Sequence, residues 1–209
     1  MFNVVKLLRN KSLRELRINV CDEMKNMTED WDKVSQFAMN GQNRKFVKHL
    51  LSRICSYVDS LVGKDIPYAL YQCPNGKQFE IEHIWADKYI KHKDQFEQES
   101  DFQFWRNSIG ALLLLPQGTN QSFSDAPYDQ KLKHYIKENT FAQTLHPQFY
   151  DKNPNFLNSP IVRRLGFTPH EKFDSENIEE REKLVTRICK RIWSLTNFSA
   201  PEIESAGAK

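Results

Sequence analysis

Glycine is scarce in this sequence of 209 residues, with seven in all. A nucleotide-binding P-loop needs a glycine-rich turn whose backbone amides surround phosphate groups, and no stretch of the sequence has that pattern. The first residues also lack a long apolar run, so neither a signal peptide nor a membrane-spanning segment is expected. We therefore expect a cytoplasmic protein with no membrane partner.

Cysteine is equally sparse and has no pattern. The sequence contains Cys21, Cys55, Cys73 and Cys189, and none of these residues lies close to another along the chain. This spacing excludes a zinc knuckle of the usual kind and shows no disulfide framework. Reduced thiols are the expectation, as in most cytosolic proteins.

The sequence has no strong excess of one charge. Its formal net charge is +3 at pH 7, which neither requires nor excludes a nucleic-acid partner. Basic residues do gather locally, in residues 6–17 and 187–191. Such stretches either contact phosphates or form ordinary solvated helix faces, and the sequence alone leaves both readings open.

The centre of the chain has the most informative pattern. Alternating residues at 79–84 predict a strand with one apolar face, and Asn75-Gly76 just before them predicts a hairpin turn after a strand near Tyr71. A second apolar run, 111–115, is followed by a helix start at 124–127 with an early proline. The predicted order is strand, long loop, strand and helix.

This arrangement resembles the HNH nucleases of the ββα-metal class, and more closely the C-terminal nuclease domain of GmrSD-type modification-dependent restriction endonucleases. The matching residues, in chain order, are Ile81-Glu82-His83-Ile84, the run 106–115, Asn120, Pro127-Tyr128 and Lys131. Each match is short, but their order and spacing together are fairly specific. The resemblance implies an α+β fold, mainly helical around a ββα-metal core with a small antiparallel β-hairpin.

The resemblance also assigns roles to residues. His83 matches the general base, a task that suits a neutral imidazole. Glu82 and Asn120 match the metal-ligand positions, and their oxygen atoms suit Mg²⁺ or Mn²⁺. Lys131 matches a lysine expected to contact phosphate. Because neighbouring side chains on a regular strand point to opposite faces, the strand must end or bulge for Glu82 and His83 to serve one site.

One position departs from the family pattern. Relatives often have Ile-Gly-Asn-Leu where this sequence has Ile109-Gly110 followed by Ala111, and an alanine side chain cannot orient the histidine. We expect Asn107 to take this task by reaching back to the His83 ring or backbone. Each of these residues also has an ordinary structural alternative to its assigned role. Asn107 and Asn120 could form a turn or a cap, and Lys131 could be an exposed helix residue.

Apolar spacing predicts helices at 12–31, 43–62 and 177–195, with a proline-rich segment of loops and short helices at 140–173. We expect one compact domain. Its predicted parts are an N-terminal helical support at 1–65, the HNH-like core at 66–140, a loop-rich segment with a closing helix at 141–198, and a disordered tail at 199–209.

The function that the resemblance implies is a divalent-metal-dependent DNA endonuclease that nicks or cleaves DNA. It would be the nuclease part of a phage-defence restriction system acting on modified or foreign DNA. The expected partners are DNA and a nucleotide-hydrolysing domain or subunit, which nothing in this sequence resembles. The alternative is a weak or inactive HNH-like domain that binds nucleic acid or a partner protein, and Ala111 supports this alternative.

Overall fold

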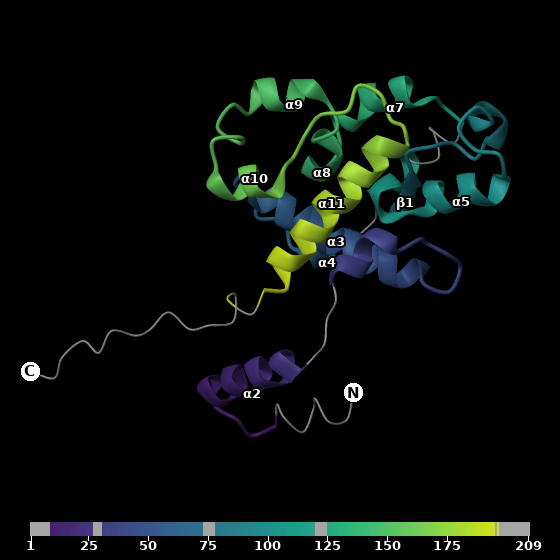
Figure 1. The fold of residues 1–209 in the computed structure, drawn as a ribbon. Coiled ribbons are helices and arrows are strands. Elements are labelled where there is room, and N and C mark those ends of the chain that lie inside the picture. The colour runs from purple at the N-terminus through teal and green to yellow at the C-terminus, as the bar shows by residue number, and fades with distance from the viewer. Residues whose placement is uncertain (1–8, 27–30, 73–77, 120–124, 195, 197–209) are drawn as a thin grey trace, which may run out of the picture.

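The computed structural model describes residues 9–26, 31–72, 78–119, 125–194 and 196. In these residues helices dominate, and a two-stranded antiparallel sheet lies among them, with β1 between α11 and α5 in the view of Figure 1. The predicted α+β class is therefore confirmed. Among the described residues, no helix combines the length and the apolar character that crossing a membrane requires.

The elements follow one another along the chain as α2 (Leu13–Asn26), η1 (Trp31–Gln36), α3 (Arg44–Ser60), α4 (Tyr68–Gln72), β1 (Phe79–His83), η2 (Tyr89–His92), α5 (Glu99–Asn107), η3 (Ile109–Ala111), β2 (Leu112–Pro116), α7 (Tyr128–Tyr135), α8 (Thr140–Gln143), α9 (Pro147–Lys152), α10 (Pro160–Leu165) and α11 (Ser175–Ile192). The labels η mark short 3₁₀-helices. The order strand, long connection, strand and helix is the predicted one, in β1, β2 and α7.

The two strands pair in a regular antiparallel register, with Glu82 opposite Leu113 and His83 opposite Leu112. The strand predicted just before Asn75-Gly76 is wrong, because α4 occupies that position. The Tyr71 ring packs against the ring of Phe79, with centroids 4.9 Å apart, which fixes α4 beside β1. The Asn-Gly pair itself lies outside the described residues. The long connection predicted between the two strands contains η2, α5 and η3.

Two long helices and the second strand form the centre of the core. Leu112 to Leu115 of β2 are completely buried, which is expected of a short continuous apolar run. The predicted helices at 43–62 and 177–195 are confirmed as α3 and α11, and most of their apolar residues face inward, although Phe46 of α3 is 58% exposed. Asp174 begins α11 with a capping box that it forms with Asn177, which satisfies backbone amides at the helix start.

The ends of the chain differ from the expectation in one respect. The predicted helix at 12–31 is present as α2, but none of its described side chains is buried, and Leu13 is 83% exposed. Figure 1 shows α2 apart from the other helices, so the expected packing of this helix against the core is not observed. The predicted tail at 199–209 lies outside the described residues.

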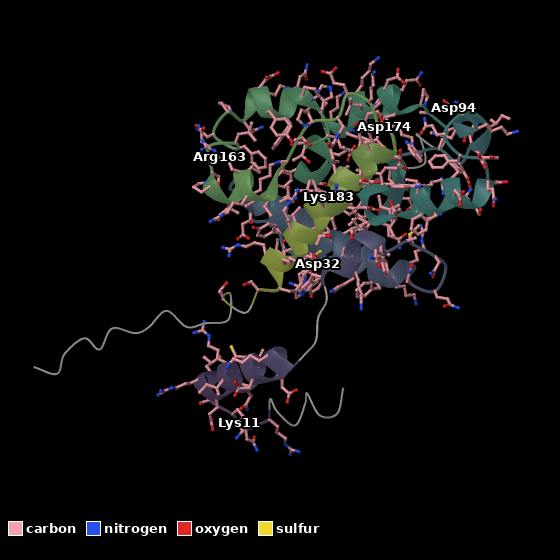
Figure 2. The ribbon with its side chains drawn as sticks, viewed as in Figure 1. Lys11, Asp32, Asp94, Arg163, Asp174 and Lys183 are labelled. Carbon is pink, nitrogen blue, oxygen red and sulfur yellow. The ribbon has the colours of Figure 1, made fainter. Side chains whose placement is uncertain are left out.

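Charged side chains cover the outer surface of the described elements (Figure 2). Lys11, Asp94, Arg163 and Lys183 all project from exposed positions. Because acidic and basic groups are interspersed, this outer surface has the mixed character of an ordinary soluble face.

Candidate active site

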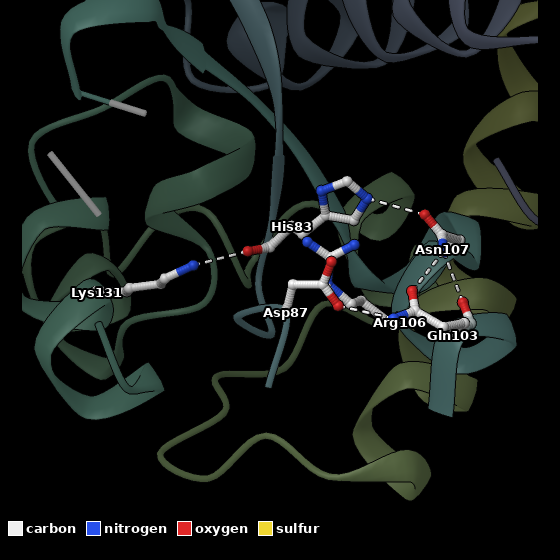
Figure 3. Close-up of polar contacts among 6 residues, drawn as sticks. All are labelled: His83, Asp87, Gln103, Arg106, Asn107 and Lys131. Carbon is white, nitrogen blue, oxygen red and sulfur yellow. Dashed lines mark hydrogen bonds and ion pairs between the residues drawn. The ribbon is translucent and has the colours of Figure 1, made fainter. Parts of the chain in front are cut away.

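His83 is the last residue of β1, and its ring contacts Asn107, the last residue of α5. Its Nε2 atom lies 3.0 Å from Oδ1 of Asn107 (Figure 3). The Asn107 amide is oriented by its own Nδ2, which donates to the Gln103 carbonyl oxygen at 2.7 Å. Since an amide oxygen only accepts, His83 Nε2 carries the proton and Nδ1 keeps the lone pair. The contact expected between Asn107 and the His83 ring is therefore present.

A segment far away in the sequence positions Asn107. The Asn107 carbonyl oxygen accepts a hydrogen bond from Met39 N at 2.7 Å, and Ile109 N donates to Phe37 O at 3.1 Å. These bonds, with a bridge between Ala38 and Ser108, hold the end of α5 on both sides of Asn107. Local sequence patterns gave no sign of this pairing, because the two segments lie far apart along the chain.

Helix α11 packs against η3, which directly follows this end of α5. Buried Arg181 donates from Nε to the Gly110 carbonyl oxygen at 2.9 Å. A Cβ atom at Gly110 would lie 2.3 Å from the carbonyl oxygen of Ile178, so only glycine allows this approach. No sequence motif singled out Arg181, although its place on the apolar face of α11, between Ile178 and Val185, marked it as a buried charge.

The surroundings of His83 keep its ring neutral. Burial, and after it the positive charge of Arg106, lowers the pKa of His83 to about 4, although the Asn107 hydrogen bond acts in the opposite direction. At pH 7 the ring is therefore unprotonated at Nδ1. A neutral imidazole with an available lone pair can accept a proton from water.

Glu82 points toward α7, where it forms a buried ion pair. Lys131 Nζ donates to Glu82 Oε1 at 2.6 Å and to the His83 carbonyl oxygen at 2.8 Å, and Tyr135 OH donates to the same Oε1 at 3.2 Å. Glu82 is 4% exposed and Lys131 is 1% exposed. Burial raises the pKa of the Glu82 carboxyl, whereas the charge of Lys131 lowers it. Lys131 is thus no exposed helix residue.

The described residues supply only part of a metal site. No group of three His, Cys, Asp or Glu side chains in the described part of the chain could hold an ion, and Asn120 lies outside it. β1 ends at His83, as a shared site requires, but its register is regular, and Glu82 and His83 contact different helices. Oε1 of Glu82 accepts hydrogen bonds from Lys131 and Tyr135. Among the described residues, no group donates a hydrogen bond to Oε2.

A neutral histidine at a strand end, held by an asparagine and next to a buried carboxylate, suits a hydrolase of the nuclease class. The family model described as GmrSD restriction endonucleases, C-terminal domain, matches residues 29–188, and the chain belongs to this family. No curated protein and no solved structure gives a significant match. Membership of this family gives the domain a restriction-endonuclease role, with DNA as the substrate.

Proposed function

We propose that this domain is an HNH-type endonuclease that hydrolyses phosphodiester bonds of DNA with His83 as the general base. The main supporting observation is the neutral His83 ring, whose Nε2 is held by Asn107. The succession of β1, β2 and α7 supports a ββα-metal core. In this proposal the cytoplasmic domain nicks or cleaves modified or foreign DNA, together with a nucleotide-hydrolysing domain or subunit.

In the proposed reaction, Nδ1 of His83 takes a proton from the water molecule that attacks phosphorus. Throughout the reaction, Asn107 Oδ1 accepts the hydrogen bond from Nε2 and so keeps the ring in one tautomer and one orientation. The bond from phosphorus to the departing oxygen then breaks, that oxygen takes a proton from a solvent water molecule, and the imidazolium returns its proton to solvent. Low basicity of His83 ensures that the base is unprotonated at the start of each turnover.

The proposed cofactor is Mg²⁺ or Mn²⁺, with Glu82 and Asn120 as its protein ligands. The absence of a hydrogen bond to Glu82 Oε2 among the described residues fits this assignment. When bound, such an ion neutralises charge on the phosphate and stabilises the departing oxygen. For Lys131, its bonds to Glu82 and to the His83 carbonyl support a positioning role more than the direct phosphate contact implied by the resemblance.

The proposal is tested by incubating supercoiled plasmid with the purified protein and Mg²⁺, Mn²⁺ or EDTA. We expect metal-dependent nicking that the His83→Ala variant loses by about 10²–10⁴-fold, since general-base catalysis is worth that much. The His134→Ala variant is a control, because His134 is exposed on α7. Equal nicking by the wild-type and His83→Ala proteins would contradict the assigned base.

Asn107 is expected to matter through the His83 ring. The Asn107→Ala variant removes the acceptor of Nε2 and should lower the nicking rate by roughly 10–100-fold, as loss of an orienting hydrogen bond does at other histidine sites. The Asn107→Asp variant keeps an acceptor and should retain more activity than Asn107→Ala. Single-turnover rates at saturating protein measure the difference. If both variants match the wild type, Asn107 does not orient the base.

A second candidate function is binding without cutting. It is favoured by the buried pair of Glu82 and Lys131, which already satisfies one carboxylate oxygen, and by Ala111 at the middle motif position. In that case the wild-type protein would retard labelled DNA in a gel or bind a partner protein, but would produce no nicks with any metal. The plasmid experiment separates the two functions directly.

A further inference from the structure

Arg106 lies in the last turn of α5, directly before the asparagine that holds the base. Figure 3 shows its guanidinium between the His83 ring and the Asp87 carboxylate. The Arg106 side chain is 15% exposed, and its Nε lies 3.9 Å from Asp87 Oδ1. Arg106 has no role in the function proposed so far, although its charge acts directly on His83.

The ion pair between Arg106 and Asp87 is weak. Asp87 is 62% exposed, and its Oδ1 already accepts a hydrogen bond from Gln103 Nε2 at 2.7 Å. In the described part of the chain, the buried Nε of Arg106 has no hydrogen-bond partner. Buried donors without a partner are rare and destabilising in folded proteins, so each one calls for an explanation, and an ion or catalytic role is among those known.

The charges nearby show what this donor could bind. Arg44 and Arg106 both place positive charge near His83, and the single described carboxylate in ion-pair range of Arg106 is the exposed Asp87. The charge of Arg106 also lowers the pKa of the Glu82 carboxyl, but Glu82 forms its ion pair with Lys131. An anion next to the base could therefore bind the guanidinium of Arg106, which is incompletely paired among the described residues. The planar fork of arginine matches two oxygens of a phosphate group.

We propose that Arg106 binds the non-bridging oxygens of the phosphodiester that is cut, and that Asp87 and Gln103 hold Arg106 near the base when no DNA is bound. This inference rests on the proposed function. Negative charge on those oxygens grows as water attacks phosphorus, so the guanidinium stabilises the transition state more than the bound DNA. Asp87 is exposed, so it can release Arg106 without the burial of an unpaired carboxylate.

The first test compares Arg106→Gln and Arg106→Lys with Lys183→Gln as control, since Lys183 is 64% exposed on α11. Single-turnover nicking should fall about 10²–10³-fold in Arg106→Gln, and Arg106→Lys should recover only part of it, because an ammonium lacks the fork. Binding to a short duplex, measured in EDTA in the His83→Ala background, should lose about one unit of salt dependence in Arg106→Gln. Unchanged binding and salt dependence would overturn the proposal.

The second test uses Asp87→Asn and excludes a merely structural role for Arg106. If Asp87 only holds the arginine, removing its charge should leave DNA binding as tight as in the wild type, or tighter. If the pair with Asp87 is structural, Asp87→Asn should lose activity as Arg106→Gln does, and that result would overturn the proposal. Failure of the proposed function is distinguishable, because the wild-type protein would then bind DNA without nicking it, and the salt dependence alone would decide the Arg106 contact.

Discussion

The Lys131→Met variant should lose about 3–5 kcal/mol of its free energy of unfolding, the usual effect of breaking a buried ion pair from one side. Both residues of this pair are almost inaccessible to solvent, with 1% of Lys131 and 4% of Glu82 exposed. Without the ammonium, the Tyr135 hydroxyl is the one hydrogen-bond donor that the described residues still offer to the carboxylate. The His83 carbonyl oxygen also loses its bond from Nζ, so nicking should fall as well.

Chemical denaturation, followed by circular dichroism, measures this loss. Lys133→Met is the matched control, because Lys133 is exposed on the same helix and should change stability by no more than about 0.5 kcal/mol. The double variant Lys131→Met with Glu82→Gln should recover part of the stability, since it removes the uncompensated charge. A Lys131→Met protein as stable as Lys133→Met would show that the ion pair contributes little.

The Gly110→Ala variant should be destabilised by about 1–3 kcal/mol or more, the range of overpacked interiors. The added Cβ would lie 2.3 Å from the Ile178 carbonyl oxygen and 2.9 Å from Cγ of Glu182, both on α11. Because the first of these atoms is backbone, α11 must move away from η3. That movement would break the bond from Arg181 to the Gly110 carbonyl and displace Asn107 from His83.

Two measurements check this prediction. Denaturation midpoints should fall for Gly110→Ala, while Gly41→Ala should be neutral or slightly stabilising, since no atom lies within 4 Å of a Cβ at Gly41. In the remaining folded protein, the nicking rate should fall more than DNA binding does, because the base loses its orientation. Equal stability of the two alanine variants would mean that α11 does not pack tightly on η3.

The sequence by itself determined the local elements and the position of the candidate base. Periodicity within a short window predicted β1, α3 and α11, because their apolar residues recur at the spacing of one strand face or one helix face, and a continuous apolar run predicted β2. The motif order placed His83 at a strand end, and the missing motif asparagine led to the expected contact from Asn107. Each of these inferences needed only nearby residues or a motif in order.

The tertiary structure alone decided which distant groups meet. The ion pair of Glu82 and Lys131 joins residues 49 positions apart, and Arg181 reaches Gly110 across 71 positions. A helix replaced the strand expected before Asn75 because the Tyr71 ring packs on Phe79 and its hydroxyl binds Asp59 of α3. Local patterns record which face of an element is buried, but the partner that satisfies a buried charge is set by the packing of elements far apart in the chain.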